Sequence, residues 1–225
     1  MSRIRKGYET RFRWLLQRIH ARKLDQGVQW LIAKAQQATA QKRITFEEAL
    51  ASIYEDLAAK PLIQKRRRNM VPAARFYCDA GLGGLARWLR AAGHEALWTA
   101  GIDDDELLRA AQKVAAVILT TDSMLMERRV LRDCLIPSFW LPPTLHIEQQ
   151  LSLVFREFNL TLKQPRCMSC GGQLLLSEKQ TLRERIPPRT YLWRDEYFIC
   201  ATCGKLFWHG THWQNIVRTL MTLKR

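Results

Sequence analysis

Apolar residues recur at helical spacing through the first third of the chain. Those within residues 12–19 fall on one face of a predicted helix, and arginines occupy its other faces. Thr45 and Glu48 have the spacing of a capping box, which predicts a further helix whose apolar stripe runs through residues 46–57. This part of the chain therefore predicts a small helical bundle with a basic surface.

Apolar runs and amphipathic segments alternate through the middle third. Gly93 is placed to end one of the predicted helices. Strands that alternate with helices at these lengths imply crossover connections and a parallel sheet, so we expect an α/β fold here. The predicted strands span residues 75–78, 95–98, 114–120 and 135–140, and the predicted helices span residues 82–92, 103–113, 124–131 and 145–158.

Charge divides the chain into three parts. The whole chain carries 36 Lys and Arg against 21 Asp and Glu, a net charge of +15. Residues 1–75 hold 17 basic and 6 acidic side chains, residues 76–160 hold 8 and 11, and residues 161–225 hold 11 and 4. An acidic segment thus lies between two basic flanks. We expect a basic α-helical region and linker at 1–74, an α/β domain at 75–162, and a small β domain with a C-terminal helix at 163–225.

Composition excludes two classes of protein. Hydrophobic residues make up 47% of the chain and charged residues 25%, which excludes wholesale disorder. The longest apolar runs are too short for a membrane-spanning helix, and charged residues interrupt the amino terminus where a signal peptide would need an apolar run. The basic excess predicts a polyanionic partner, most often nucleic acid, and we expect a cytoplasmic protein. A membrane surface is less favoured, because the basic segments lack a strongly hydrophobic face beyond a bundle core.

Two matching CxxCG motifs occur near the carboxyl end. Two thiolates at this spacing grip one tetrahedral ion, and the following glycine permits the tight turn around it. Four thiolates satisfy zinc and leave no position for an activated water, so we expect a structural zinc ribbon. The predicted zinc ligands are Cys167, Cys170, Cys200 and Cys203, with 29 residues between Cys170 and Cys200.

Two other uses of these cysteines remain open. Paired disulfides would need an oxidising compartment and would leave Cys78 and Cys134 as lone thiols. A thioredoxin-like redox pair would occur once, at a strand–helix junction, rather than twice in a loop-rich tail. His209 and His212 are spare ligands, and the nearby aromatic and basic residues suit either the core of the ribbon or contacts with RNA.

Acidic residues gather in the middle third of this basic chain. Asp79 follows the first strand, Asp122 follows the strand that ends at residue 120, and four acids occupy residues 103–106. Side chains at the carboxyl ends of parallel strands converge on one edge, and carboxylates gathered there need a cation such as Mg²⁺ or Mn²⁺. Such an ion activates water for attack on phosphorus. The alternative is that these acids only cap helices, as Asp104 and Asp122 are placed to do.

Several motifs, taken in order, resemble one known family. The first set resembles the PIN-like RNase domain of the Mut-seven C-terminal type. It comprises Phe76-Tyr-Cys-Asp79, Leu82-Gly-Gly-Leu-Ala-Arg-Trp-Leu-Arg90, Asp104-Asp-Glu-Leu-Leu and Ile118-Leu-Thr-Thr-Asp122. The two CxxCG motifs and Trp208-His-Gly-Thr-His-Trp213 are similar to the zinc ribbon that ends members of that family. The resemblance extends over residues 75–215 and leaves residues 1–70 outside it.

The resemblance implies a PIN-like fold and metal-dependent ribonuclease chemistry. Matched by position, the catalytic acids of the family fall on Asp79, Asp104 and Asp122, with Asp105 next to the middle one. These acids would bind Mg²⁺ or Mn²⁺. We also expect arginines of the linker and of the helix after the first strand to contact RNA phosphates, although the helical ones equally suit an exposed helix face. The arginines concerned are Arg66, Arg67, Arg68, Arg87 and Arg90.

The sequence favours a metal-dependent endoribonuclease that binds structured RNA, such as tRNA or rRNA, through its basic helices and zinc ribbon. A rival hypothesis is a non-catalytic RNA- or ribosome-binding protein with a degenerate PIN domain. It is favoured by residues 134–140, which lack the fourth acid that PIN domains often have near the last strand. A third hypothesis is a toxin-like nuclease that awaits an inhibitor.

Overall fold

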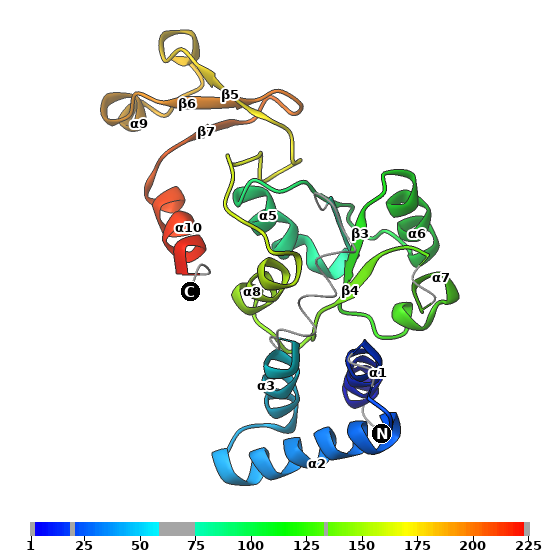
Figure 1. Ribbon diagram of the computed structural model, residues 1–225. Helices are drawn as coiled ribbons and strands as arrows, with labels where there is room; N and C mark the ends of the chain where they lie inside the picture. The colour runs from blue at the N-terminus through cyan, green and yellow to red at the C-terminus, as the bar shows by residue number, and fades with distance from the viewer. Residues whose placement is uncertain (1–2, 19–20, 59–74, 133–134, 223–225) are drawn as a thin grey trace.

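The computed structural model describes residues 3–18, 21–58, 75–132 and 135–222. Three helices come first, a four-stranded sheet with its helices follows, and a three-stranded sheet and a last helix end the chain (Figure 1). This is the α/β fold predicted from the sequence, with a helical region before it and a small β domain after it. Within the described residues, no helix is both long and apolar enough to cross a membrane.

The first three helices form where the apolar pattern predicts them. They are α1 (Arg3–Arg18), α2 (Leu24–Lys42) and α3 (Phe46–Ala58). The predicted capping box at the start of α3 is confirmed: the Thr45 amide donates to Glu48 Oε2 at 2.7 Å, and the Glu48 amide donates to Thr45 Oγ1 at 3.2 Å. α2 lies across α1 and α3, which stand between it and the central sheet (Figure 1).

The central sheet is parallel throughout, as predicted. Its strands are β1 (Phe76–Cys78), β2 (Ala96–Trp98), β3 (Val117–Thr120) and β4 (Ser138–Trp140), in the order β2-β1-β3-β4. Alternate residues of the strands face opposite layers. One face packs against α5 (Gly83–Ala91) and α8 (Ile147–Phe158), and the other packs against α6 (Asp104–Lys113).

Three predicted elements differ in the structure. The strand predicted at 135–140 begins only at Ser138, because the amides of Leu135 and Ile136 still donate to the Val130 carbonyl in α7. The strand predicted at 114–120 begins only at Val117, because Val114 ends α6 and Ala115 adopts a left-handed backbone with φ 50°. The helix predicted at 124–131 is a 3-10 turn, η2 (Leu125–Glu127), followed by the single-turn α7 (Arg129–Arg132). Arg128 breaks the helix because its backbone is extended, with ψ 132°.

The amino-terminal helices share one core with the sheet. The Trp140 ring, at the end of edge strand β4, meets Tyr8 at 5.1 Å and Tyr54 at 6.1 Å, both edge-to-face. At Gly7, the approach of α1 is so close that an added Cβ would lie 3.1 Å from both Ser123 Cβ and the Trp140 ring. The helices therefore pack against the end of β4 through the Trp140 ring.

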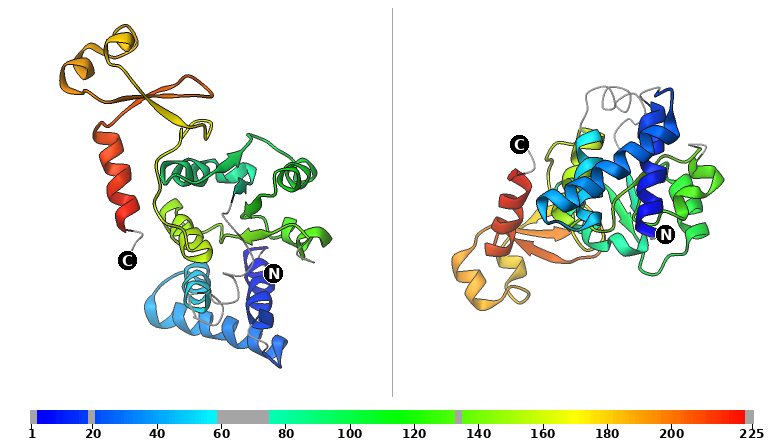
Figure 2. Two further views of the ribbon diagram at one scale, coloured as in Figure 1. Left: turned by 45° about the horizontal axis from the view of Figure 1, so that its top comes forward. Right: turned by 90° about the horizontal axis from the view of Figure 1, so that it is seen from below.

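The carboxyl-terminal part is a small antiparallel sheet with helices. Its strands β5 (Leu174–Ser177), β6 (Tyr197–Cys200) and β7 (Leu206–Trp208) pair in that order and project from the central domain (Figures 1 and 2). The connection from β5 to β6 holds the turn η3 (Gln180–Leu182) and the helix α9 (Pro188–Trp193). The final helix, α10 (Thr211–Thr222), returns Ile216 and Leu220 to the main core.

Tyr8→Ala tests whether α1 shares one core with the central sheet. Tyr8 is fully buried, so its loss should lower the free energy of unfolding by about 3–5 kcal/mol. The measurement is urea denaturation followed both at α-helical and at tryptophan signals, which should shift together. Trp30→Ala is the control: its ring is 63% exposed, and the change should stay within about 0.5 kcal/mol. An unaltered midpoint in Tyr8→Ala would contradict a shared core.

Candidate active site and metal centre

Asp79 is fixed at the carboxyl end of β1 by the neighbouring strand. Its amide donates to the Leu119 carbonyl at 2.9 Å and so extends the pairing of β1 with β3. Its Oδ2 accepts the Thr120 hydroxyl at 2.6 Å, and its Oδ1 accepts the Ala80 amide at 2.5 Å. The carboxylate is therefore held by two hydrogen bonds, and the backbone of Asp79 by a third.

Thr120 links Asp79 to the second acid. While its hydroxyl donates to Asp79, its Oγ1 accepts the Asp122 amide at 2.9 Å, and Thr120 itself is fully buried. Asp122 Oδ1 in turn accepts the Met124 amide at 2.7 Å and closes the turn after β3. The threonine before this turn thus sets the spacing of both acids, a role that its sequence position alone does not reveal.

The three adjacent aspartates at the start of α6 have different surroundings. Asp103 is exposed and caps the helix by accepting the Glu106 amide at 2.8 Å. Asp105 is exposed and pairs with Arg128 at 2.7 Å. Asp104 is half-buried: burial raises the pKa of its carboxyl, and the negative charges of Asp122 and Asp79 raise it further. Of the three, Asp104 is the one held near both strand-end acids.

An open pocket of about 570 Å³ lies at the start of α6. Asp103, Asp104 and Asp105 line it together with Arg109 and Arg128, two cations that sequence reasoning missed. Both arginines are exposed and so are available to a phosphate. Arg109 follows Asp105 by four residues in α6, which is about one helical turn. This spacing is the signal in the sequence that would have identified Arg109.

Trp98, the last residue of β2, supports the turn that follows Asp79. Its indole nitrogen donates to the Ala80 carbonyl at 2.9 Å and so holds η1 (Ala80–Leu82), the turn that follows Asp79. A Cβ at Gly83 would lie only 2.8 Å from the indole ring. Glycine at this position therefore lets Trp98 close over the start of α5.

The arginines predicted to contact RNA differ in their surroundings. Arg87 is exposed on α5 and stays a candidate. Arg90, by contrast, is 3% exposed, and its guanidinium donates to backbone carbonyls inside the protein. We therefore correct the prediction for Arg90, because a buried and bonded guanidinium is not available to RNA. Arg66, Arg67 and Arg68 lie outside the described residues.

The four predicted zinc ligands come together. Cys167 Sγ lies 3.6 Å from Cys203 Sγ, Cys170 Sγ lies 3.4 Å from Cys200 Sγ, and all four sulfurs lie within 4.8 Å of one another. Tetrahedral Zn–S bonds of about 2.3 Å place sulfurs about 3.8 Å apart, so this cluster fits zinc. Disulfide sulfurs would be about 2 Å apart, which these are not. The glycines after each motif have left-handed backbones, with φ 85° at Gly171 and φ 67° at Gly204.

Backbone amides prepare the sulfurs for a metal ion. The Thr202 and Cys203 amides donate to Cys200 Sγ at 3.4 Å and 3.5 Å, and the Gly172 amide donates to Cys170 Sγ at 3.4 Å. Burial acts to raise the pKa of Cys200, but the amides of Cys203 and Thr202, together with hydrogen bonds to the Cys170 and Cys203 side chains, lower that pKa to about 6. Burial raises the pKa of Cys167 and Cys170. His209, a spare ligand, instead lies 3.5 Å from Glu196 and stacks on Trp213.

The acids form a looser group than the cysteines. Among the described residues, the cysteines are the only set of three or more metal-ligating side chains whose ligand atoms lie within 4.8 Å of one another. Oxygens bound to one Mg²⁺ lie closer than that, because each Mg–O bond is about 2.1 Å. The carboxylates at the sheet edge would therefore have to move toward one another to bind one ion.

Comparison with known families agrees with this arrangement. The family model described as the Mut7-C RNAse domain matches residues 74–220, which is more than half of the chain. The match begins just before β1 and ends within α10, so it includes the acids and the cysteines and leaves α1–α3 outside. It indicates a ribonuclease-type function with RNA as substrate or partner. No curated protein and no solved structure matches the chain.

Cys200→Ser tests the metal centre. The purified wild-type protein should carry one zinc ion per chain, and Cys200→Ser should carry much less, because a hydroxyl is a poor zinc ligand. Elemental analysis of the desalted proteins measures this. Zinc should also leave the wild-type protein as the pH falls, since protons compete for the thiolates. Cys78→Ala is the control: Cys78 is buried in β1, and its loss should leave the zinc content unchanged. Full zinc occupancy in Cys200→Ser would contradict a four-cysteine site.

Proposed function

Because this chain belongs to the Mut7-C RNase domain family, we propose that it is a metal-dependent endoribonuclease. It would hydrolyse RNA phosphodiester bonds at the carboxyl edge of the parallel sheet. The observation that carries this proposal is the state of Asp104, a half-buried carboxyl whose pKa is raised by burial and by the nearby charges of Asp122 and Asp79. Like charges held together at the end of a sheet are unfavourable, unless a cation binds between them.

The three acids suit a hard divalent cation. Asp79, Asp104 and Asp122 offer only oxygen donors, and they come from two strand ends and one helix start, so the surrounding fold limits their positions. They would hold Mg²⁺ or Mn²⁺, which lowers the pKa of a bound water and neutralises charge that develops on the phosphate. Because burial and the charges of Asp122 and Asp79 raise the pKa of Asp104, its carboxyl takes up a proton at a higher pH than an ordinary aspartate, and a bound cation would favour its ionised form.

Arginines around the pocket are placed to hold the RNA backbone. Arg128 bonds Asp105 at 2.7 Å at the pocket, where a phosphate would compete with the carboxylate for its guanidinium. Arg109 lines the same pocket, and Arg87 is exposed on α5. The basic amino-terminal region, the linker arginines at 66–68 and the zinc ribbon would extend the contact over a structured RNA such as tRNA or rRNA. Association with the ribosome and a cytoplasmic location stay predictions.

Asp104→Asn is the sharpest test of the catalytic assignment. It should lower Mn²⁺-dependent cleavage of structured RNA by more than about 100-fold, since even residues that only support metal ligands are worth about 10- to 100-fold. Asp103→Asn is the matched control. It makes the same charge change one residue away, and asparagine keeps the helix cap, so its activity should equal that of the wild type. Cleavage is measured on labelled RNA with and without Mn²⁺. Equal cleavage by wild-type and Asp104→Asn proteins would refute the assignment.

A non-catalytic RNA-binding role is the second candidate, and strand β4 favours it. β4 offers Ser138, Phe139 and Trp140 and so no fourth acid, and Trp140 is used by the core. This rival predicts no Mn²⁺-dependent cleavage by the wild-type protein and RNA affinity that does not depend on Asp104. Filter binding of the same RNAs, run beside the cleavage assay, separates the two candidates.

Asp122→Asn should stabilise the metal-free protein. Asparagine keeps the oxygen that accepts the Met124 amide but removes a charge that raises the pKa of Asp104. The ionised form of Asp104 is disfavoured in the fold, so the repulsion is present above the folded pKa and is lost as the pH falls through it. Asp122→Asn should therefore unfold at higher urea concentration than the wild type at pH 7, with no advantage at pH 3. Added Mn²⁺ should raise the urea midpoint of the wild type by more than that of Asp122→Asn. A lower midpoint at pH 7 would contradict repulsion at this edge.

A further inference from the structure

Arg90 is a buried cation that lies between two parts of the protein. It stands in the last turn of α5 and is 3% exposed. Among the described residues, it forms no ion pair with a carboxylate. A guanidinium taken out of water without a counter-charge is costly, so its position calls for a compensating partner.

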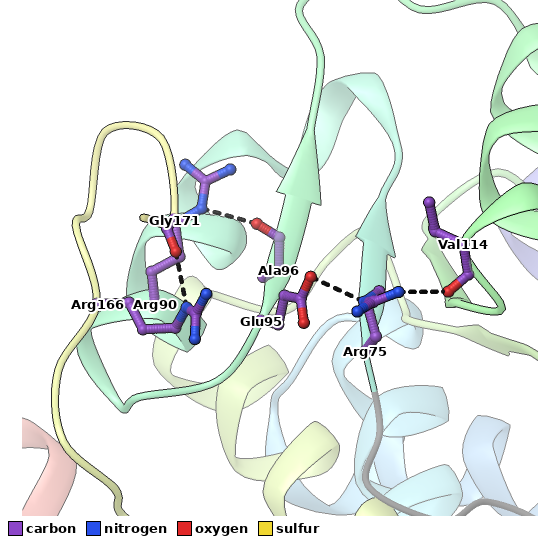
Figure 3. Close-up of polar contacts among 7 residues, drawn as sticks. All are labelled: Arg75, Arg90, Glu95, Ala96, Val114, Arg166 and Gly171. Atoms are coloured by element: carbon purple, nitrogen blue, oxygen red, sulfur yellow. Dashed lines mark hydrogen bonds and ion pairs between the residues drawn. The ribbon is translucent and has the colours of Figure 1, made fainter. Parts of the chain in front are cut away.

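The guanidinium of Arg90 donates hydrogen bonds both to the sheet and to the first cysteine motif. Its Nε donates to the Ala96 carbonyl on β2 at 2.7 Å (Figure 3). Its Nη1 donates to the carbonyls of Met168 and Ser169, at 3.1 Å and 2.8 Å. These two residues separate Cys167 from Cys170, so Arg90 holds the turn that carries both sulfurs.

Backbone contacts reinforce the same junction. The Arg166 amide donates to the Arg90 carbonyl at 2.9 Å, and Arg166 Nε donates to the Gly171 carbonyl at 2.7 Å (Figure 3). A Cβ at Gly171 would lie 3.3 Å from Arg90 Nε, so glycine here also gives the guanidinium room. The first cysteine motif is therefore packed onto the end of α5 on several sides.

The negative charge of a zinc–thiolate group would compensate the buried guanidinium of Arg90. Burial lowers the pKa of Arg90, and negative charge on the nearby sulfurs of Cys170 and Cys167 acts in the opposite direction. Cys78 is also near Arg90, but burial raises its pKa to about 12, so it stays a neutral thiol. Four thiolates outweigh the two positive charges of Zn²⁺, so a loaded site of this type carries a net negative charge. A buried guanidinium beside it is then compensated, and it favours the thiolate form of the ligands.

We propose that Arg90 is the positioning residue and counter-ion of the four-cysteine centre, and that it joins this centre to the nuclease sheet. Arg90 does not bind the metal. It fixes the backbone of the first cysteine motif against β2 and neutralises part of the charge of the zinc–thiolate group. Binding of zinc therefore stabilises the junction of the ribbon with β2 as well as the ribbon itself. This role rests on zinc binding by the cysteines and does not depend on RNA cleavage.

Rates of zinc release test the proposal in the full-length protein. Arg90→Met keeps an unbranched apolar stem but removes the charge and the donors, and it should release zinc to a chromogenic chelator about 10- to 100-fold faster than the wild type. Arg90→Lys keeps the charge, but one ammonium cannot bond Ala96 and the Met168–Ser169 turn as the guanidinium fork does, so its rate should lie between the two.

Arg75→Met is the matched control. Arg75 belongs to the same row of contacts, with Glu95 at 2.8 Å and the Val114 carbonyl at 2.8 Å, but it does not touch the cysteine motif (Figure 3). Its loss should weaken the sheet and leave the zinc release rate at the wild-type value. Equal acceleration by Arg75→Met and Arg90→Met would overturn the proposal, because the effect would then be general destabilisation.

Hydrogen exchange adds a readout of the junction. Removal of zinc from the wild type should increase amide exchange in β2 and in the last turn of α5, whereas in Arg90→Lys the exchange there should be raised already and respond little to zinc. If Arg90→Met does not fold, the zinc release rate and the hydrogen exchange of Arg90→Lys together test the proposal. Wild-type zinc release by Arg90→Lys, or no response of β2 to zinc in the wild type, would overturn the proposal. Neither result would alter the outcome of the Asp104→Asn cleavage assay.

Discussion

The parallel register of β1 with β3 is the constraint on which the acidic edge depends. Cys78 pairs with Leu119, so the chain leaves β1 at Asp79 directly beside Thr120. The buried hydroxyl of Thr120 then bonds Asp79 and also receives the Asp122 amide. A shift by one residue would turn these side chains to the opposite face of the sheet. One register therefore places both strand-end acids where α6 adds Asp104.

Two kinds of contact join the three parts of the molecule. On the amino-terminal side the contact is apolar, since Tyr8 and Tyr54 both pack edge-to-face against the Trp140 ring. On the carboxyl-terminal side, Ile216 and Leu220 of α10 also enter the main core, but the buried guanidinium of Arg90 adds a polar contact by bonding carbonyls of both the sheet and the first cysteine motif. The apolar contact contributes through burial, whereas the polar one depends on the charge of its surroundings. Under our proposal for Arg90, the attachment of the ribbon is therefore the one that responds to metal binding.

Charge is distributed as a phosphodiesterase would need it. The acidic segment between the basic flanks contains the three acids that meet at the sheet edge, and their mutual repulsion is a cost that the fold alone does not repay. Local conflict of this kind is typical of functional sites, where stability is exchanged for binding. Arg128 pairs with the exposed neighbour Asp105, and although its charge acts to lower the pKa of Asp104, burial and the charges of Asp122 and Asp79 outweigh it.

The sequence by itself determined what depends on short spacing. Alternating apolar segments predicted the parallel sheet, Thr45 and Glu48 predicted a helix cap, and the CxxCG spacing predicted the sulfur cluster, because neighbours in the chain create each of these features. Only the tertiary structure showed that Asp104 is half-buried near the strand-end acids whereas Asp105 is exposed and pairs with Arg128. It also showed that Arg90 is buried. Those outcomes depend on the surroundings that distant segments supply, since one turn of a helix presents adjacent aspartates in different directions, and an arginine is exposed or buried according to what packs over it.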